Sequence, residues 1–217
     1  ANTDWQRAIS RQANLQNHNL ALSGGSTAAQ YRASLNYFDN PGIIIGSGLS
    51  RVQGRVNAQS RLLDDRLRLN LNFTSAQTRD RYLTAENTGG FTGGVFINAL
   101  TFLPTNPVFG TSVPGTPFFE LGSGQQNQRN PLALAEQISD RANTTRTFGN
   151  LQAEYQLVRG LTASVNVGVD RQSSRRDTYI PSNSPLGAGY TAAGLAGLGR
   201  IGSVNLQNST VQTLVTY

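Results

Sequence analysis

Few side chains in this sequence fall into a pattern that supports catalysis or metal binding. His18 is the single histidine and cysteine is absent, so the chain offers no histidine pair, thiol nucleophile or cysteine ligands. Asp64 and Asp65 are adjacent carboxylates, but they lie in a predicted short turn, where turn chemistry favours aspartate. The glycine-rich run at 187–202 lacks the strand, helix and acidic residue of a dinucleotide site. We therefore expect no enzymatic activity, no metal and no cofactor.

Positive charge is the most prominent chemical feature of the chain. Lysine is absent, so arginine supplies all 18 basic residues, and the formal net charge is +6. The arginines are dispersed, without a basic helix or an aromatic RNA-binding motif, so we expect no nucleic-acid partner. Several of them share the polar face of three neighbouring predicted strands, where they would line the path of a solute: Arg32, Arg51, Arg55, Arg66 and Arg68.

The elements that position these arginines are β-strands. From residue 30 to 38 polar and apolar side chains alternate with a period of two, which indicates a strand with one polar and one apolar face. The same alternation predicts strands at 17–23, 28–38, 49–61, 66–76, 148–158 and from 161, with a seventh beginning after 208. We expect the apolar face to carry Tyr31, Leu35, Val56, Leu69, Leu71, Leu151, Tyr155, Val165 and Val167.

The predicted connections alternate between short and long. Short turns follow Gly24, Leu62 and Arg159, whereas longer connections follow Asp39, Thr78 and Ser173. In an antiparallel meander this order places the short turns at one rim and the long connections at the other, as in an outer-membrane barrel. Charged residues make up only 14 %, against roughly 25 % in soluble domains, and no stretch reaches the roughly 18 apolar residues of a membrane helix. A membrane-spanning role would therefore use strands.

The longest predicted connection, 78–147, contains a helix candidate at 131–141 and many phenylalanines. Exposed apolar side chains gather at interfaces, so these rings either pack within the connection or contact a partner. For a contact with a solute or a lid protein we favour Phe118, Phe119 and Tyr179. The tryptophan, Trp5, is expected to anchor a loop by packing.

Five stretches resemble a known family. NTDWQRAI and QNHNLALSGGS near the start, then YRASLNYFDNPGII and RVQGRVNAQ, are similar to the beginning of the barrel in SusC/RagA-like TonB-dependent transporters of Bacteroidota. FGNLQAEYQLVRGLTASVNVGVD, at 148–170, resembles a later hairpin of the same barrel. The similarity covers essentially all of residues 1–217.

The resemblance implies a fold, a location and partners. The fold would be all-β: an antiparallel meander forming a partial, open segment of a barrel of about 22 strands in the outer membrane of a Gram-negative, Bacteroidota-like cell. Residues 1–217 would belong to one TonB-dependent receptor barrel domain, with 78–147 as a long extracellular loop. The implied partners are outer-membrane lipid, a SusD-like lipoprotein lid, TonB through a missing N-terminal segment, and a glycan or peptide solute. The arginines would then line the solute path or pair with acids of the missing plug.

The chain is expected to be an internal piece of a longer protein. It begins at Ala1 without Met or a signal peptide and stops at Tyr217 within an alternating run. The expected function is TonB-dependent import of a large nutrient. The alternative is a non-transporting surface β-protein, such as an adhesin or a structural β-sandwich, whose apolar faces would be buried between two sheets.

Overall fold

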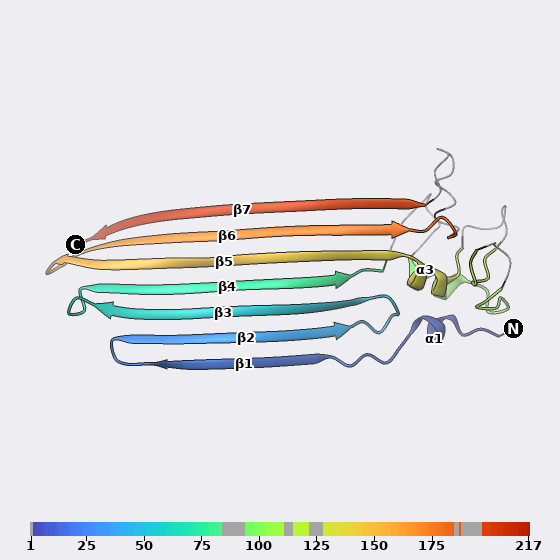
Figure 1. The fold of residues 1–217 in the computed structure, drawn as a ribbon, viewed down its shortest axis with the longest axis horizontal. Coiled ribbons are helices and arrows are strands. Elements are labelled where there is room, and N and C mark those ends of the chain that lie inside the picture. Colours follow the sequence, from blue (N-terminus) through green and yellow to red (C-terminus); the bar gives the residue numbers. More distant parts are fainter. Residues whose placement is uncertain (1, 84–93, 111–114, 122–127, 185–186, 188–196) are drawn as a thin grey trace.

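The computed structural model describes residues 2–83, 94–110, 115–121, 128–184, 187 and 197–217. Within them the chain forms one seven-stranded antiparallel sheet in the order β1-β2-β3-β4-β5-β6-β7, which confirms the predicted meander (Figure 1). The strands are β1 (Gln16–Gly25), β2 (Ala29–Pro41), β3 (Gly48–Leu62), β4 (Leu67–Arg81), β5 (Ser139–Val158), β6 (Leu161–Ile180) and β7 (Leu198–Thr216). The helices are α1 (Trp5–Ile9), α2 (Val95–Thr101) and α3 (Pro131–Gln137).

The register aligns most apolar side chains of β1 to β6 on one face, whereas β7 carries Val204, Leu206 and Leu214 on the other. Because directly paired residues share a face, a single cross-strand row can be followed through the sheet. One such row consists of Tyr31, Ala58, Leu71, Leu151, Val167 and Val211. The adjacent row lies on the opposite face and is polar. It includes Arg32, Asn57, Asn72 and Asn150.

No second sheet covers the apolar face in the described part of the chain. Leu71 in the middle of β4 keeps 38 % of its surface exposed, and Leu151 beside it keeps 46 %. The β-sandwich alternative is therefore wrong, since a sandwich would bury these side chains between two layers.

The connections are sorted between the two rims as predicted. Residues 26–28, 63–66 and 159–160 make the tight turns at the rim on the left of Figure 1. The connection 42–47 and the described parts of the longer connections 82–138 and 181–197 lie at the opposite rim. The turn after β3 is left-handed at Leu63, Asp64 and Asp65, with φ of 57°, 53° and 64°. Aspartate tolerates this conformation better than most residues, which is why the adjacent acids belong to a turn rather than to a site.

The strands run further into the long connections than the alternation suggested. β4 continues to Arg81 and β5 starts at Ser139, so the excursion expected at 78–147 is shorter, 82–138. Likewise, β6 continues to Ile180 and β7 starts at Leu198, so the second long connection, expected at 173–208, is only 181–197. The added segments of β4 and β5 are almost entirely polar, so no period of apolar residues marked them. Those of β6 and β7 include apolar residues such as Ile180, Ile201 and Leu206.

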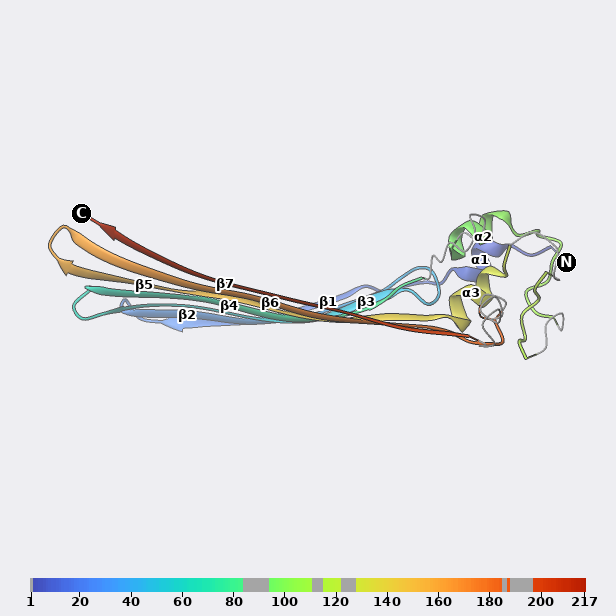
Figure 2. The same cartoon turned by 90° about the horizontal axis from the view of Figure 1, so that it is seen from above.

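A small helical cap closes the rim of long connections, and Figure 2 shows its three helices gathered beyond the end of the sheet. Its hydrophobic core joins Trp5 and Ile9 of α1, Val95, Ala99 and Phe102 of α2, Leu134 and Ala135 of α3, and Ile138 and Ile180 from the strand ends. The indole of Trp5 meets Phe102 edge-on at 5.0 Å and donates its Nε1–H to the carbonyl of Leu103 at 3.0 Å. Trp5 is thus the packing anchor that was predicted.

The connection between β2 and β3 also packs against this cap. Gly46 has a φ of +88°, and a Cβ atom there would lie 2.6 Å from the carbonyl oxygen of Ala135 in α3. Only glycine allows both this conformation and this close approach. None of the helices in the described part is long and apolar enough to cross a membrane.

Candidate functional site

The polar face of the sheet carries a ladder of amide side chains. Asn72 of β4 donates to Asn150 of β5 at 3.3 Å, Asn150 donates to Asn166 of β6 at 3.2 Å, and Asn166 donates to Gln212 of β7 at 3.4 Å. On the same face, Gln59 of β3 donates to Gln30 of β2 at 2.6 Å. Amide groups bind both donors and acceptors, so this face suits a wet environment and not a hydrocarbon one.

Arginines stand among these amides on β2, β3 and β4. The register places five arginines of these strands on the polar face. Their cross-strand pairs are Arg32 with Asn57, Arg55 with Ser34, Arg51 with Phe38, and Arg68 with Arg61. We call Arg32, Arg51, Arg55, Arg61 and Arg68 the wall arginines. Arg66, also expected in this group, lies in the turn between β3 and β4, one residue before β4 begins, so only its strand assignment was wrong and its place facing the lumen stays a prediction.

The wall arginines make no ion pair with a carboxylate of the described residues. Arg51 stacks over the ring of Phe38 at 5.7 Å from its centroid. By contrast, Arg146 on the polar face of β5 forms a two-point ion pair with Asp170 of β6 at 3.1 and 2.8 Å. The polar face of β2 to β4 is therefore mainly positive and attracts anionic groups, although Asp80 lies at the end of β4 and Glu154 of β5 lies opposite Arg68. On β5 and β6, Arg146 is neutralised by Asp170.

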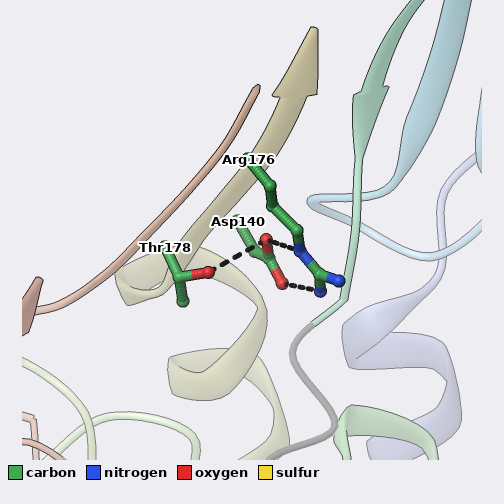
Figure 3. A network of polar contacts seen from close by, with 3 residues as sticks. All are labelled: Asp140, Arg176 and Thr178. Carbon is green, nitrogen blue, oxygen red and sulfur yellow. Dashed lines mark hydrogen bonds and ion pairs between the residues drawn. The ribbon is translucent and has the colours of Figure 1, made fainter. Parts of the chain in front are cut away.

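A buried carboxylate ties the outer ends of β5 and β6 together, as Figure 3 shows. The side chain of Asp140 is 2 % exposed and receives two hydrogen bonds from Arg176, at 2.7 Å from Nε and 2.5 Å from Nη2. The hydroxyl of Thr178 donates a third at 3.2 Å. The guanidinium of Arg176 also lies over the ring of Tyr82, 4.7 Å from its centroid, and so joins the start of the 82–138 connection to the sheet.

A second buried carboxylate holds the cap together. Glu120 is 2 % exposed, and its Oε2 accepts the backbone N–H of Asn130 at 3.1 Å. Burial raises the pKa of Glu120 to about 7, although the Asn130 bond and the charge of Arg129 act in the opposite direction. Asn130 caps α3: its side-chain oxygen accepts from the N–H groups of Leu132 and Ala133, and its amide donates to two loop carbonyls, at 2.8 and 3.0 Å.

The aromatic residues expected to contact a solute or lid occupy different environments. Phe118 is 4 % exposed and stacks on Phe109 with ring centroids 5.6 Å apart, so its ring is sequestered within the chain and supports the self-packing alternative. Phe119 is partly buried against the cap core, and Tyr179 at the end of β6 is 58 % exposed. Of the remaining phenylalanines, Phe91 lies outside the described residues, Phe102 is buried and Phe96 is 53 % exposed.

Sequence reasoning missed both buried carboxylates. Asp140 fell within the helix expected at 131–141, whereas the structure places it in β5, and its partners lie on β6 at the far end of a hairpin. Glu120 stands in an irregular segment with no periodicity. A signal was present only for Asn130, because asparagine directly before Pro131 is a typical helix start.

The comparisons with known proteins agree with this geometry. No family model matches the chain. The TonB-dependent receptor SusC of Bacteroides thetaiotaomicron is 31 % identical over 172 residues, which covers 71 % of this chain and 16 % of the receptor. TonB-dependent receptor P3 of Formosa agariphila is also 31 % identical, over 191 residues, covering 87 % of this chain and 19 % of that receptor. This chain belongs to the SusC-like TonB-dependent receptors.

A solved structure supports the fold of this SusC-like chain. The RagAB peptide importer in its closed-closed state matches 85 % of the chain with a TM-score of 0.64 and 23 % identity. The match takes up 20 % of the importer chain, so the SusC-like chain spans about a fifth of such proteins. The relatives are named as receptors and an importer, in agreement with the absence of enzymatic activity expected from the sequence.

Proposed function

We propose that this SusC-like chain is part of the wall and outer loops of a transporter that imports a large nutrient, a glycan or peptide, across the outer membrane in a TonB-dependent manner. The observation that carries the proposal is that β1 to β6 of this sheet combine a largely apolar face with a face rich in amides and arginines. An apolar face toward lipid and a polar face toward a wet lumen are what a barrel wall requires.

The wall arginines are proposed to face the lumen. Their single sign favours carboxylate-bearing groups, which either a passing solute or an acidic plug segment would supply. The amide ladder beside them binds hydroxyl and amide groups, the polar groups common to glycans and peptides. TonB would act through an N-terminal segment.

The helical cap is proposed to lie outside the cell, where a SusD-like lipoprotein lid would meet it. Short turns face the periplasm in outer-membrane barrels and longer loops face outward, so the rim of 42–47, 82–138 and 181–197 is the outer one. Tyr179, exposed at this rim, is the contact residue we retain from the sequence. The RagAB name of the structural neighbour is consistent with a two-component importer.

The test uses the full-length transporter in its own cell. Uptake of fluorescent oligosaccharides and of fluorescent peptides is measured in the wild type, in a strain lacking the transporter and in a strain lacking TonB. We expect one solute class to enter only when both transporter and TonB are present. Uptake that is unchanged by loss of the transporter, for every solute tried, would contradict the proposal.

Two substitutions on the polar face refine the test. Arg32→Gln with Arg55→Gln removes two charges from the wall while keeping polar side chains there. The matched control, Arg66→Gln with Arg159→Gln, removes two charges from the short turns. We expect the first pair to reduce uptake about tenfold or more if each lost charged hydrogen bond contributes about 1.5 kcal/mol. Equal uptake by the two variants, at equal protein levels, would remove the wall arginines from the path.

A further inference from the structure

A second group of arginines lies on the apolar face of the sheet, beyond the end of the apolar band. The alternation of β4, β5 and β6 places Arg79, Arg81, Arg141, Arg171 and Arg175 on the same face as Leu71 and Val167. All five are exposed. Arg79, Arg81, Arg141 and Arg175 lie toward the rim of the long connections, whereas Arg171 lies near the middle of β6, in the cross-strand row of Leu35. This face is therefore apolar in the middle and basic at one rim.

The register brings two of these arginines directly opposite each other. Arg81 of β4 pairs with Arg141 of β5, and Arg79 lies in the neighbouring row of the same face. Like charges directly opposite on a sheet repel and destabilise the strand pair. An anion between them would remove this repulsion, and arginine is the side chain that best binds phosphate at two points.

The carboxylates of this rim leave most of the charge uncompensated. Arg175 forms an ion pair with Asp177 at 2.9 Å, but the other four arginines make no ion pair within the described residues. A hollow of about 460 Å³ opens between the strand ends and is lined by Arg79, Arg81 and Arg141 together with Ser50 and Asn143. Asp39 and Asp80 also line it, but Asp80 belongs to the opposite face of β4, so Asp39 is the lining acid that shares the face of the three arginines.

We propose that this basic rim binds the phosphate group of an anionic lipid in the outer leaflet. The inference rests on the proposed membrane placement, which puts the apolar band in hydrocarbon and the arginines at the level of the headgroups. Basic clusters next to a membrane-spanning segment bind anionic headgroups, each arginine adding to the attraction. The wall arginines cannot serve this lipid because they lie on the opposite face of the sheet.

The test measures lipid retention by the purified full-length transporter. The detergent-solubilised protein is incubated with lipid A carrying both phosphates, or with the same lipid after its phosphates are removed, and bound lipid is counted by native mass spectrometry. The variant is Arg81→Gln with Arg141→Gln, and the control is Arg66→Gln with Arg159→Gln. We expect the variant alone to lose phosphorylated lipid by roughly 25-fold, with no change for the dephosphorylated lipid.

Each other outcome overturns the proposal. Equal retention of the two lipids by the wild type would show that phosphate is not recognised. Equal losses in the variant and control pairs would show that net charge, and not this rim, sets retention. Loss of both lipids in the variant would indicate a misfolded barrel. The single substitution Arg79→Gln, in the same hollow, is then measured, and unchanged phosphate-dependent retention would overturn the proposal. Nutrient uptake is measured separately, so a failure of the import proposal leaves this result unaffected.

Discussion

Placing an arginine on the apolar face should destabilise the protein more than placing one at the adjacent position, on the polar face. Leu71 occupies the middle of the most apolar row, beside Ala58 and Leu151, whereas Asn72 points to the polar face. An arginine at the bilayer midplane costs about 2 to 4 kcal/mol. At Asn72 the change removes one exposed amide hydrogen bond, of 3.3 Å, whose net contribution is about 0.5 to 1 kcal/mol.

The assay is reversible urea unfolding of the full-length transporter in phosphatidylcholine bilayers. Leu71→Arg and Asn72→Arg add the same side chain to adjacent positions, so charge, size and strand propensity are matched. We expect Leu71→Arg to lower the free energy of unfolding by at least about 1 kcal/mol more than Asn72→Arg. Equal losses at both positions, or the larger loss at Asn72, would refute the assignment of the apolar face to lipid.

Three further predictions concern the cap and the strand ends. Burial raises the pKa of Glu120 to about 7, so its contribution to stability is complete below its ordinary pKa of 4.5 and is lost as pH rises through 7. The opening free energy of the cap, measured by hydrogen exchange corrected for the intrinsic rate, should therefore fall by about 3 kcal/mol between pH 5 and pH 8. Glu120→Gln should abolish this dependence. Arg176→Ala should lower the melting temperature more than Asp140→Ala. Loss of Arg176 leaves the carboxylate of Asp140 buried without its cation, whereas loss of Asp140 leaves a guanidinium that is 54 % exposed. The reverse order would contradict the network in Figure 3. Phe118→Ala should open the cap to protease by removing about 3 to 5 kcal/mol of packing, whereas Tyr179→Ala should leave the cleavage rate unchanged.

The prediction of the fold from sequence succeeded where the information was local. Alternation with period two identifies a strand and assigns its two faces within a few residues, so the polar and apolar sets were correct for β2, β3 and the inner half of β4. The lengths of the connections then fixed an antiparallel meander with sorted rims. The helix expected at 131–141 exists but ends at Gln137, since β5 takes over the residues that follow.

The sequence by itself therefore determined the sheet, its two faces and its family, because each depends on neighbours along the chain. Tertiary structure decided which polar residues act together. Asp140 and Arg176 meet only because a hairpin folds β6 back onto β5, and Glu120 meets Asn130 only because the loop packs on α3. Arg81 and Arg141 are separated by the whole of the 82–138 connection and become neighbours through the pairing of β4 with β5. Charge and burial at these positions are set by partners distant in sequence, and no local pattern encodes such a partner.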